Sequence, residues 1–149
     1  MVPATALRVR EHTASHLNAR IQEGIEHRLA DLRQPDRSAL ITQRLAELER
    51  EWDVERSLQT NFAAISLAAL GLAGGVSRGW YALAFAVPAF MVQHALQGWC
   101  PPLSVLRRMG VRTAREINDE RFALKCLRGD FDQLGPAPAA GELIDAVRR

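Results

Sequence analysis

Cysteine is scarce in this chain, which contains only Cys100 and Cys126. Two thiols this far apart do not form the framework of a disulfide-rich secreted domain. Without a Cys-x-x-Cys pair or a Cys/His quartet, no structural zinc site is expected, and no cofactor is predicted. His12 and His16 share one helix face, but no third ligand completes a metal site, so a solvated surface is the preferred interpretation.

The motifs that mark common enzyme classes are also missing. The sequence has no Gly-rich phosphate loop, no Gly-x-Ser-x-Gly and no His-Glu-x-x-His. The segment 1–16 lacks the cationic and then apolar pattern of a signal peptide, so no cleaved leader is expected. The sequence therefore predicts no catalytic residue.

Charge is missing from the middle of the chain. The totals are nearly balanced, with 19 Lys+Arg against 17 Asp+Glu, and give no reason to expect nucleic-acid binding. The 50 residues 57–106, however, carry one formal charge, Arg78. An ordinary soluble sequence would carry about a dozen charges in such a window. The block is therefore interpreted as membrane segments, with the lipid bilayer as its partner.

Two apolar runs make up this block, separated by the turn 77–79. The first, 58–76, has about 19 residues, close to the roughly 20 that a span needs. The second, 80–99, begins and ends with tryptophan, and at about 1.5 Å per residue the two indoles stand roughly 28 Å apart. Pro88 is expected to kink it. A buried soluble hairpin is the alternative, but the other residues are too polar to build a core around it.

The predicted fold class is all-α: a two-span transmembrane helical hairpin, 58–99, with amphipathic cytoplasmic helices on both sides. The arm 1–57 forms two helices broken near Pro35, and the second is expected to run directly into the first span. Residues 100–131 form juxtamembrane helices and 132–149 a flexible tail with at most a helical turn or two. The apolar residues that repeat at helical spacing in the arm are Leu17, Ile21, Ile25, Leu29 and Leu32, then Ile41, Leu45, Leu48 and Trp52.

Further signals divide the juxtamembrane segment. A short helix is predicted to end near Gly110. Thr113 and Glu116 have the spacing of a capping box, which begins another helix, and Gly129 is suited to end it.

Positive charge predicts the orientation of the hairpin. Arginines flank both of its ends, whereas the connecting turn has only Arg78, so both termini are expected in the cytoplasm. The flanking arginines are Arg44, Arg50 and Arg56 before the first span, and Arg107, Arg108, Arg112 and Arg115 after the second.

Polar residues near the cytoplasmic ends of the two spans form a predicted interhelical layer. Folding the hairpin about Arg78 brings Gln59 level with Gln97, and it places Asn61 at the depth of Gln93 and His94. Hydrogen bonds between such side chains clamp membrane helices. The alternative is a small polar site around His94, because an ionisable residue within a membrane is a default site hypothesis.

Gly71 and Gly75 form a Gly-x-x-x-Gly motif, which allows close helix approach. Its use within the hairpin and its use in a homodimer remain equally open.

Cys100 marks the end of the second span, because Pro101 disfavours the α conformation at the preceding residue. The thiol then lies near the start of the next helix, whose dipole favours thiolate, while the carbonyls of the preceding helix oppose it. Two interpretations stay open: an inert boundary residue, or a reactive or ligand-binding thiol near His94.

The segment 51–61, "EWDVERSLQTN", followed by an apolar hairpin and "QHALQGWCPPLSVLRRMGVRTAREINDERFALKCLRGDF", resembles the YgaP-like inner-membrane transmembrane domain family, a bacterial domain of unknown function. The resemblance covers about residues 51–131, and Gly98, Cys100 and Pro101 carry its most specific part. It implies a two-span protein of the bacterial inner membrane that assists dimerisation. In the family's naming member the hairpin follows a rhodanese domain. Here the first 50 residues contain no cysteine, so sulfur transfer is not implied.

The predicted function is a membrane-anchored assembly or interaction module, self-associating or bound to unidentified protein partners. The alternative is a thiol-dependent accessory in sulfur or redox handling that uses Cys100. A small-solute channel built by oligomers has only the polar layer in its favour.

Overall fold

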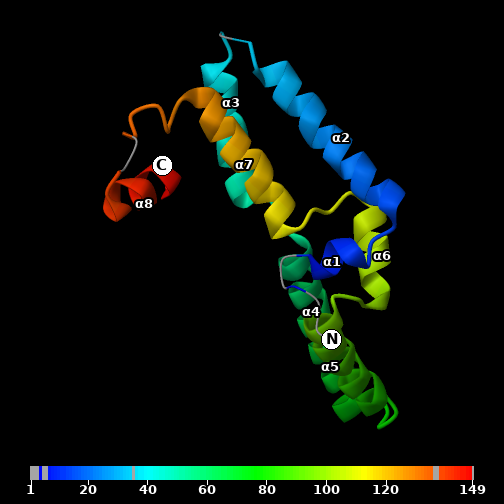
Figure 1. The fold of residues 1–149 in the computed structure, drawn as a ribbon. Helices are drawn as coiled ribbons and strands as arrows, with labels where there is room; N and C mark the ends of the chain where they lie inside the picture. The colour runs from blue at the N-terminus through cyan, green and yellow to red at the C-terminus, as the bar shows by residue number, and fades with distance from the viewer. Residues whose placement is uncertain (1–3, 5–6, 35, 136–137, 149) are drawn as a thin grey trace. The chain divides into compact units, whose positions relative to one another are not determined.

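The computed structural model describes residues 4, 7–34, 36–135 and 138–148, and within these ranges every regular element is a helix (Figure 1). The all-α prediction is therefore confirmed for the described part of the chain. The predicted break at Pro35 and residues 136–137 of the predicted tail lie outside the described residues. The helices are α1 (Arg8–Glu11), α2 (Ser15–Leu32), α3 (Ser38–Arg50), α4 (Val54–Gly75), α5 (Trp80–Gln97), α6 (Pro101–Arg108), α7 (Ala114–Arg128) and α8 (Ala140–Arg148).

The chain forms two compact units. The first, the hairpin unit, comprises residues 1–22 and 52–115. The second, the arm unit, comprises residues 23–51 and 116–149.

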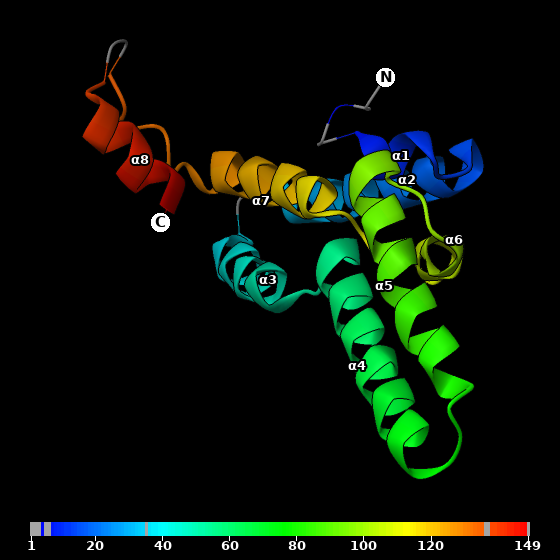
Figure 2. The same ribbon diagram turned by 90° about the horizontal axis from the view of Figure 1, so that it is seen from below.

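In the hairpin unit, α4 and α5 lie side by side and antiparallel, joined by a short turn (Figure 2). The buried side chains of α4 follow one face, because their spacing repeats the helical period. Near the turn, this buried face consists of the small residues Ala69 and Ala73. Near the base of the hairpin, it consists of the larger residues Val54, Leu58 and Phe62. Ala84, Val87 and His94 are the buried residues of α5, and Pro88 lies within that helix without ending it.

The expectation that the second arm helix runs directly into the first apolar segment was wrong. α3 ends at Arg50, and both Glu51 and Asp53 have extended backbone conformations. The Asp53 side chain accepts a hydrogen bond of 2.7 Å from the backbone N–H of Arg56. This N-cap satisfies one of the free amides at a helix start, so α4 begins as a new helix.

The hairpin unit has a small core at the base of the hairpin. Residues from α1, α4, α5 and α6 meet there, and Met91, Leu106 and Val111 pack against it. The chain returns to this core after Gly110, where the N–H of Val54 donates to the carbonyl of Arg112 at 2.9 Å. The core residues are Val9, Val54, Leu58, Phe62, Val87, Cys100 and Leu103.

The arm unit is built around the apolar seam that the sequence predicts. Ile41, Leu45 and Leu48 of α3 are buried with Ile117 and Leu124 of α7, and Leu29 and Leu32 of α2 pack against them. α7 begins at Ala114, which places Thr113 at the N-cap position, and it ends before Gly129, whose φ is +84°. Both predicted ends of this helix are confirmed. The predicted tail 132–149 contains α8. Lys125 of α7 donates a hydrogen bond to the carbonyl of Val147 in that helix.

One helical stretch among the described residues is long and apolar enough to cross a membrane. It lies within Ser38–Gly75, a range that contains α3, the break at 51–53 and α4, and its apolar part is in α4. Only 22% of its most apolar window is buried inside the protein. α5 does not meet the same criterion, because Gln93, His94 and Gln97 lower the hydropathy of its last turns.

Candidate site at the base of the hairpin

The corner between α5 and α6 depends on a glycine. Gly98 ends α5 with φ +79° and ψ 11°, and its N–H donates to the carbonyl of His94 at 2.7 Å. Only glycine adopts this left-handed conformation without steric cost. A Cβ at Gly98 would also lie 2.6 Å from Cβ and 2.7 Å from the carbonyl carbon and oxygen of Arg8. Glycine therefore both turns the chain and lets α1 approach the corner.

Cys100 lies at the N-cap position of α6. Its backbone is extended, with φ −155° and ψ 158°, and Pro101 and Pro102 occupy the first helical positions. Proline is suited to these positions, because its fixed φ matches the helix and its missing N–H would have no partner there. The Cys100 side chain is fully buried in the core at the hairpin base and makes no capping hydrogen bond.

His94 is the polar centre of this region. Its side chain is fully buried, and Nε2 donates to Oε2 of Glu55 at 3.2 Å. The other carboxylate oxygen of Glu55, Oε1, accepts from Nη2 of Arg8 at 2.8 Å. The network thus joins α5, α4 and α1, and it supplies the buried imidazole with the partner that burial of a polar group requires.

The Cys100 thiol faces the same imidazole. It lies close enough to interact electrostatically with His94. The second ring nitrogen, Nδ1, is nevertheless buried without a partner of standard hydrogen-bond geometry. Because sulfur is a weak and diffuse acceptor, we treat the contact as a close approach of thiol and imidazole rather than a strong hydrogen bond.

The carboxylate of Glu55 is held in its charged form. The hydrogen bond from His94 is the largest influence on its pKa; partial burial opposes it, and the hydrogen bond from Arg8 supports it. Together they lower the pKa of Glu55 to about 2. Glu55 is therefore anionic at neutral pH, and its carboxylate attracts the guanidinium of Arg8 and the imidazole of His94.

A thiol, an imidazole and a carboxylate in this order resemble a nucleophile, its base and the group that orients the base. The solvent exposure of Cys100 is zero, however, and Val9, Leu58 and Leu103 surround it. No reagent reaches the sulfur in this conformation. The network as it stands therefore joins α1, α4, α5 and α6 at one buried point.

The predicted polar layer is arranged differently from the sequence expectation. Gln59, Asn61 and Gln97 are exposed and Gln93 is half-buried. The Asn61 amide donates to the carbonyl of Ser57 in its own helix at 2.8 Å. Among the described residues, the polar link between α4 and α5 is His94 with Glu55, and the four amides do not join the two helices.

The two glycines of the predicted packing motif lie away from the helix contact. A Cβ placed at Gly71 or Gly75 meets no atom within 4 Å. Ala69 and Ala73 are buried instead, on the face of α4 that meets α5. The glycine face is thus not used for close approach within the described hairpin.

Sequence reasoning missed Glu55 and Arg8. Glu55 precedes Leu58 by three residues and Phe62 by seven, so it lies on the buried face of α4, and that spacing is a signal that was available. Arg8 is 47 positions from Glu55, and no local pattern predicts its return to the hairpin.

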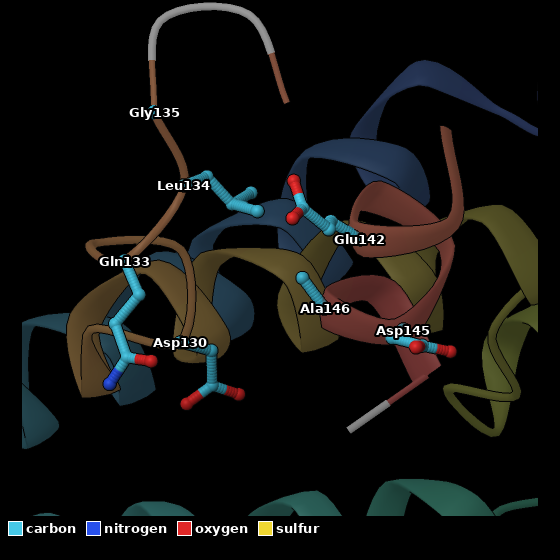
Figure 3. Close-up of a pocket in the computed structure, with 7 residues that line it drawn as sticks. All are labelled: Asp130, Gln133, Leu134, Gly135, Glu142, Asp145 and Ala146. Carbon is cyan, nitrogen blue, oxygen red and sulfur yellow. The ribbon is translucent and has the colours of Figure 1, made fainter. Parts of the chain in front are cut away.

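A hollow in the arm unit is not a comparable site. Figure 3 shows it between the turn after α7 and α8, with Asp130, Glu142 and Asp145 among its lining residues. Its volume is about 360 Å³. Asp130 accepts two hydrogen bonds from Arg128, at 2.7 and 2.6 Å, and Glu142 accepts from the backbone N–H of Ala139. Across the described residues, no group of three His, Cys, Asp or Glu side chains is placed to hold a metal ion.

Comparisons of this chain with protein-family models, curated proteins and solved structures give no match.

Proposed function

We propose that this protein is a bacterial inner-membrane protein in which α4 and α5 form a two-span anchor for an assembly or interaction module. The observation that supports the proposal most directly is the exposed apolar surface of the hairpin. Leu67, Val76 and Phe85 are 70%, 72% and 76% exposed, and large apolar side chains surround them on both helices. The others include Ile65, Leu70, Leu72, Leu83, Phe90, Val92 and Leu96.

Water is a poor solvent for such a surface. Burying one large apolar side chain contributes about 1.5–3 kcal/mol, so moving these ten side chains from water into an apolar environment is strongly favourable. Exposed apolar patches of this extent mark a partner or a membrane. A bilayer suits both helices, since their charges are confined to the two ends and the turn.

The ends of α5 support a second span despite its lower hydropathy. Trp80 begins the helix and Trp99 follows its last residue by two positions; both are amphipathic residues that favour membrane interfaces. The most polar residue within the helix, His94, is hidden against Glu55. The excess of arginine outside the two spans supports a cytoplasmic location for both termini.

Self-association through α4 is the finer part of the proposal. Gly71 and Gly75 leave open space where side chains would project, and Ala64 and Ala68 are exposed on the same helix. A second copy of the chain can approach such a surface closely in lipid. Replacing both glycines with leucine should lower the dimer fraction in mild detergent, measured by light scattering; Ala63→Leu is the control.

Membership of the YgaP-like family remains part of this proposal. The resemblance depends on the quoted residues Gly98, Cys100 and Pro101, which form the corner at which α5 ends and α6 begins.

Membrane fractionation tests the anchor. The full chain should stay in the membrane after alkaline carbonate washing and require detergent for extraction. A cysteine introduced at Ser77, in the turn, should react with a membrane-impermeant thiol reagent from the periplasm, whereas Cys126, which is exposed, should react only after the inner membrane is opened. Recovery of the folded chain in the soluble fraction without detergent would contradict the anchor.

A second candidate function is a thiol-dependent accessory. The observation in its favour is the approach of Cys100 to His94, which Glu55 orients. Its chemistry requires that α1 move away from the corner, since Val9 helps to bury the sulfur. If it operates, Arg8→Gln should raise the rate at which a thiol reagent modifies Cys100. Equal slow rates in the parent and the variant would count against it.

A further inference from the structure

Apolar side chains of α6 stay exposed although the helix packs against the hairpin. α6 buries Leu103, whereas Pro101, Val105 and Met109, the residue that follows the helix, are exposed. These three residues lie four positions apart, so they form one strip along the helix, which we call the α6 strip. Val105 is 56% exposed and Met109 73%. A short helix with one face on the protein and an exposed apolar strip beside it is typical of a membrane surface.

The α6 strip lies at the level where the predicted first span begins. Leu103, on the buried face of α6, belongs to the same core as Leu58 and Phe62 of α4. Leu58 is the first residue of the predicted span 58–76. Figure 2 shows α6 beside the base of the hairpin. On the two-span anchor proposed above, this is the level at which acyl chains give way to headgroups.

The strip also continues the exposed apolar surface of α5. Val92 and Leu96 are exposed in the last turns of α5, and Trp99 is exposed between α5 and α6. Tryptophan favours the boundary between acyl chains and headgroups. The exposed apolar surface therefore passes from the second proposed span onto α6, and one environment can cover both.

Two exposed arginines at the base of the hairpin lack an anionic partner among the described residues. Arg108 lies next to the α6 strip and makes no ion pair there. The guanidinium of Arg56, in the first turn of α4, lies 4.4 Å from the centroid of the Trp52 ring and likewise makes no ion pair. Trp52 and Trp99 thus each have an exposed arginine on the same or the next helix. Anionic headgroups supply the missing negative charge, and the arginine side chains are long enough to reach them.

We propose that the α6 strip docks on the inner leaflet of the membrane, with Val105 and Met109 against acyl chains and Arg108 on an anionic phospholipid headgroup. This inference rests on the proposed membrane anchor and adds an interfacial contact with the same bilayer. Interfacial anchors set the tilt of a span. Docking of α6 therefore fixes the orientation of the hairpin in the bilayer.

Fluorescence quenching of the full chain in nanodiscs tests the docking. In a Cys126→Ser background, Met109→Cys and Ser104→Cys each carry one environment-sensitive dye, and the background chain measures any labelling of buried Cys100. The dye at Met109→Cys should emit at shorter wavelength and be quenched by lipids brominated in their acyl chains. The dye at Ser104→Cys, exposed on another side of the same helix, should be quenched mainly by iodide in water. Val105→Cys should repeat the result of Met109→Cys.

Headgroup selectivity tests the role of Arg108. At equal mole fraction, brominated phosphatidylglycerol should quench the dye at Met109→Cys more than brominated phosphatidylcholine does. Arg108→Gln should lower this preference about fivefold, the usual contribution of one arginine near an anionic surface. Arg78→Gln, in the turn at the other end of the hairpin, is the matched control and should leave the preference unchanged. Circular dichroism should show the same helix content in all variants, because the substituted side chains are exposed.

The outcomes separate the docking of α6 from the anchor. A chain that resists carbonate washing, but whose dye at Met109→Cys is quenched by iodide as strongly as the dye at Ser104→Cys, would overturn the docking and leave the anchor standing. Shielding from both quenchers would mean that protein covers the strip and would also overturn it. A chain that carbonate releases, but whose dye is quenched by brominated lipid in added vesicles, would contradict the anchor alone. An unchanged preference in Arg108→Gln would overturn the headgroup contact.

Discussion

The hairpin and the arm unit distribute apolar residues in opposite ways. In the arm unit, Ile41, Leu45 and Leu48 of α3 and Ile117 and Leu124 of α7 face inward, and most of the surface residues are charged or polar. In the hairpin, alanines fill much of the contact between α4 and α5, and the larger leucine and phenylalanine side chains project outward. The first arrangement is typical of packing in water, where apolar burial drives folding. The second is typical of lipid, where small residues bring helices together.

The two units also differ in how they hold a buried charge. In the arm unit, Glu120 is fully buried and receives hydrogen bonds from Arg28 at 3.1 Å to each oxygen and from Arg44 at 3.0 Å. In the hairpin unit, Glu55 is partly exposed and accepts from Arg8 and from a buried histidine. The Glu120 carboxylate is buried beneath the guanidinium groups that bind it, whereas the Glu55 carboxylate can still be hydrated by solvent. We therefore expect the first to affect stability more.

The largest predicted effect is loss of the Glu120 carboxylate. Glu120→Ala removes the hydrogen bonds from Arg28 and Arg44 and should destabilise the arm unit by about 3–5 kcal/mol, the usual effect of breaking a buried ion pair. Urea unfolding in mild detergent, followed by circular dichroism, measures the change. Glu47→Ala is a matched control, since Glu47 also pairs with Arg44 but is solvated, and should change little. Equal effects of the two substitutions would contradict the difference in burial.

The second prediction compares an arginine introduced in the hairpin with an arginine introduced in the arm unit. Leu67→Arg places a charge near the middle of the proposed first span and should oppose insertion by about 2.5–3.5 kcal/mol. Leu127→Arg, at an exposed position of α7, should have little effect. The fraction of chain that resists carbonate extraction measures both. If Leu67→Arg were tolerated as well as Leu127→Arg, the outer surface of the hairpin would not face lipid.

The third prediction compares two glycines with the same backbone conformation. Gly98→Ala and Gly110→Ala both place a Cβ on a residue of positive φ, at about 1–2 kcal/mol each. Gly110 has open space around it, whereas at Gly98 the new atom collides with the backbone of Arg8. Gly98→Ala should therefore be the more destabilising and should also make Cys100 reactive toward a thiol reagent. Similar behaviour of the two variants would show that α1 does not dock at the corner.

Local patterns predicted most of the helices, because each depends on neighbours in the sequence. The spacing of Ile41, Leu45 and Leu48 identified the arm seam, and Gly129 identified the end of α7. The break before α4 was missed because the capping role of Asp53 was overlooked within a continuous helical pattern. The candidate site was predicted only in part: Cys100 and His94 lie close in sequence, but Arg8 reaches them through a tertiary contact that no local periodicity encodes.

The smallest predicted effect is the pH dependence of the hairpin base. Because the hydrogen bonds from His94 and Arg8 lower the pKa of Glu55 from 4.5 to about 2, the folded state binds fewer protons than the unfolded state between these values. The contribution of Glu55 is therefore fully present above about pH 5 and is lost as the pH falls toward 2. Between about pH 5 and pH 2, the unfolding temperature of Glu55→Gln should fall less than that of the parent protein. The fall for the control variant Glu47→Ala should be closer to that of the parent. A steeper acid sensitivity in Glu55→Gln would mean that the carboxylate is protonated in the folded protein, and the network at the hairpin base would then lack its anion.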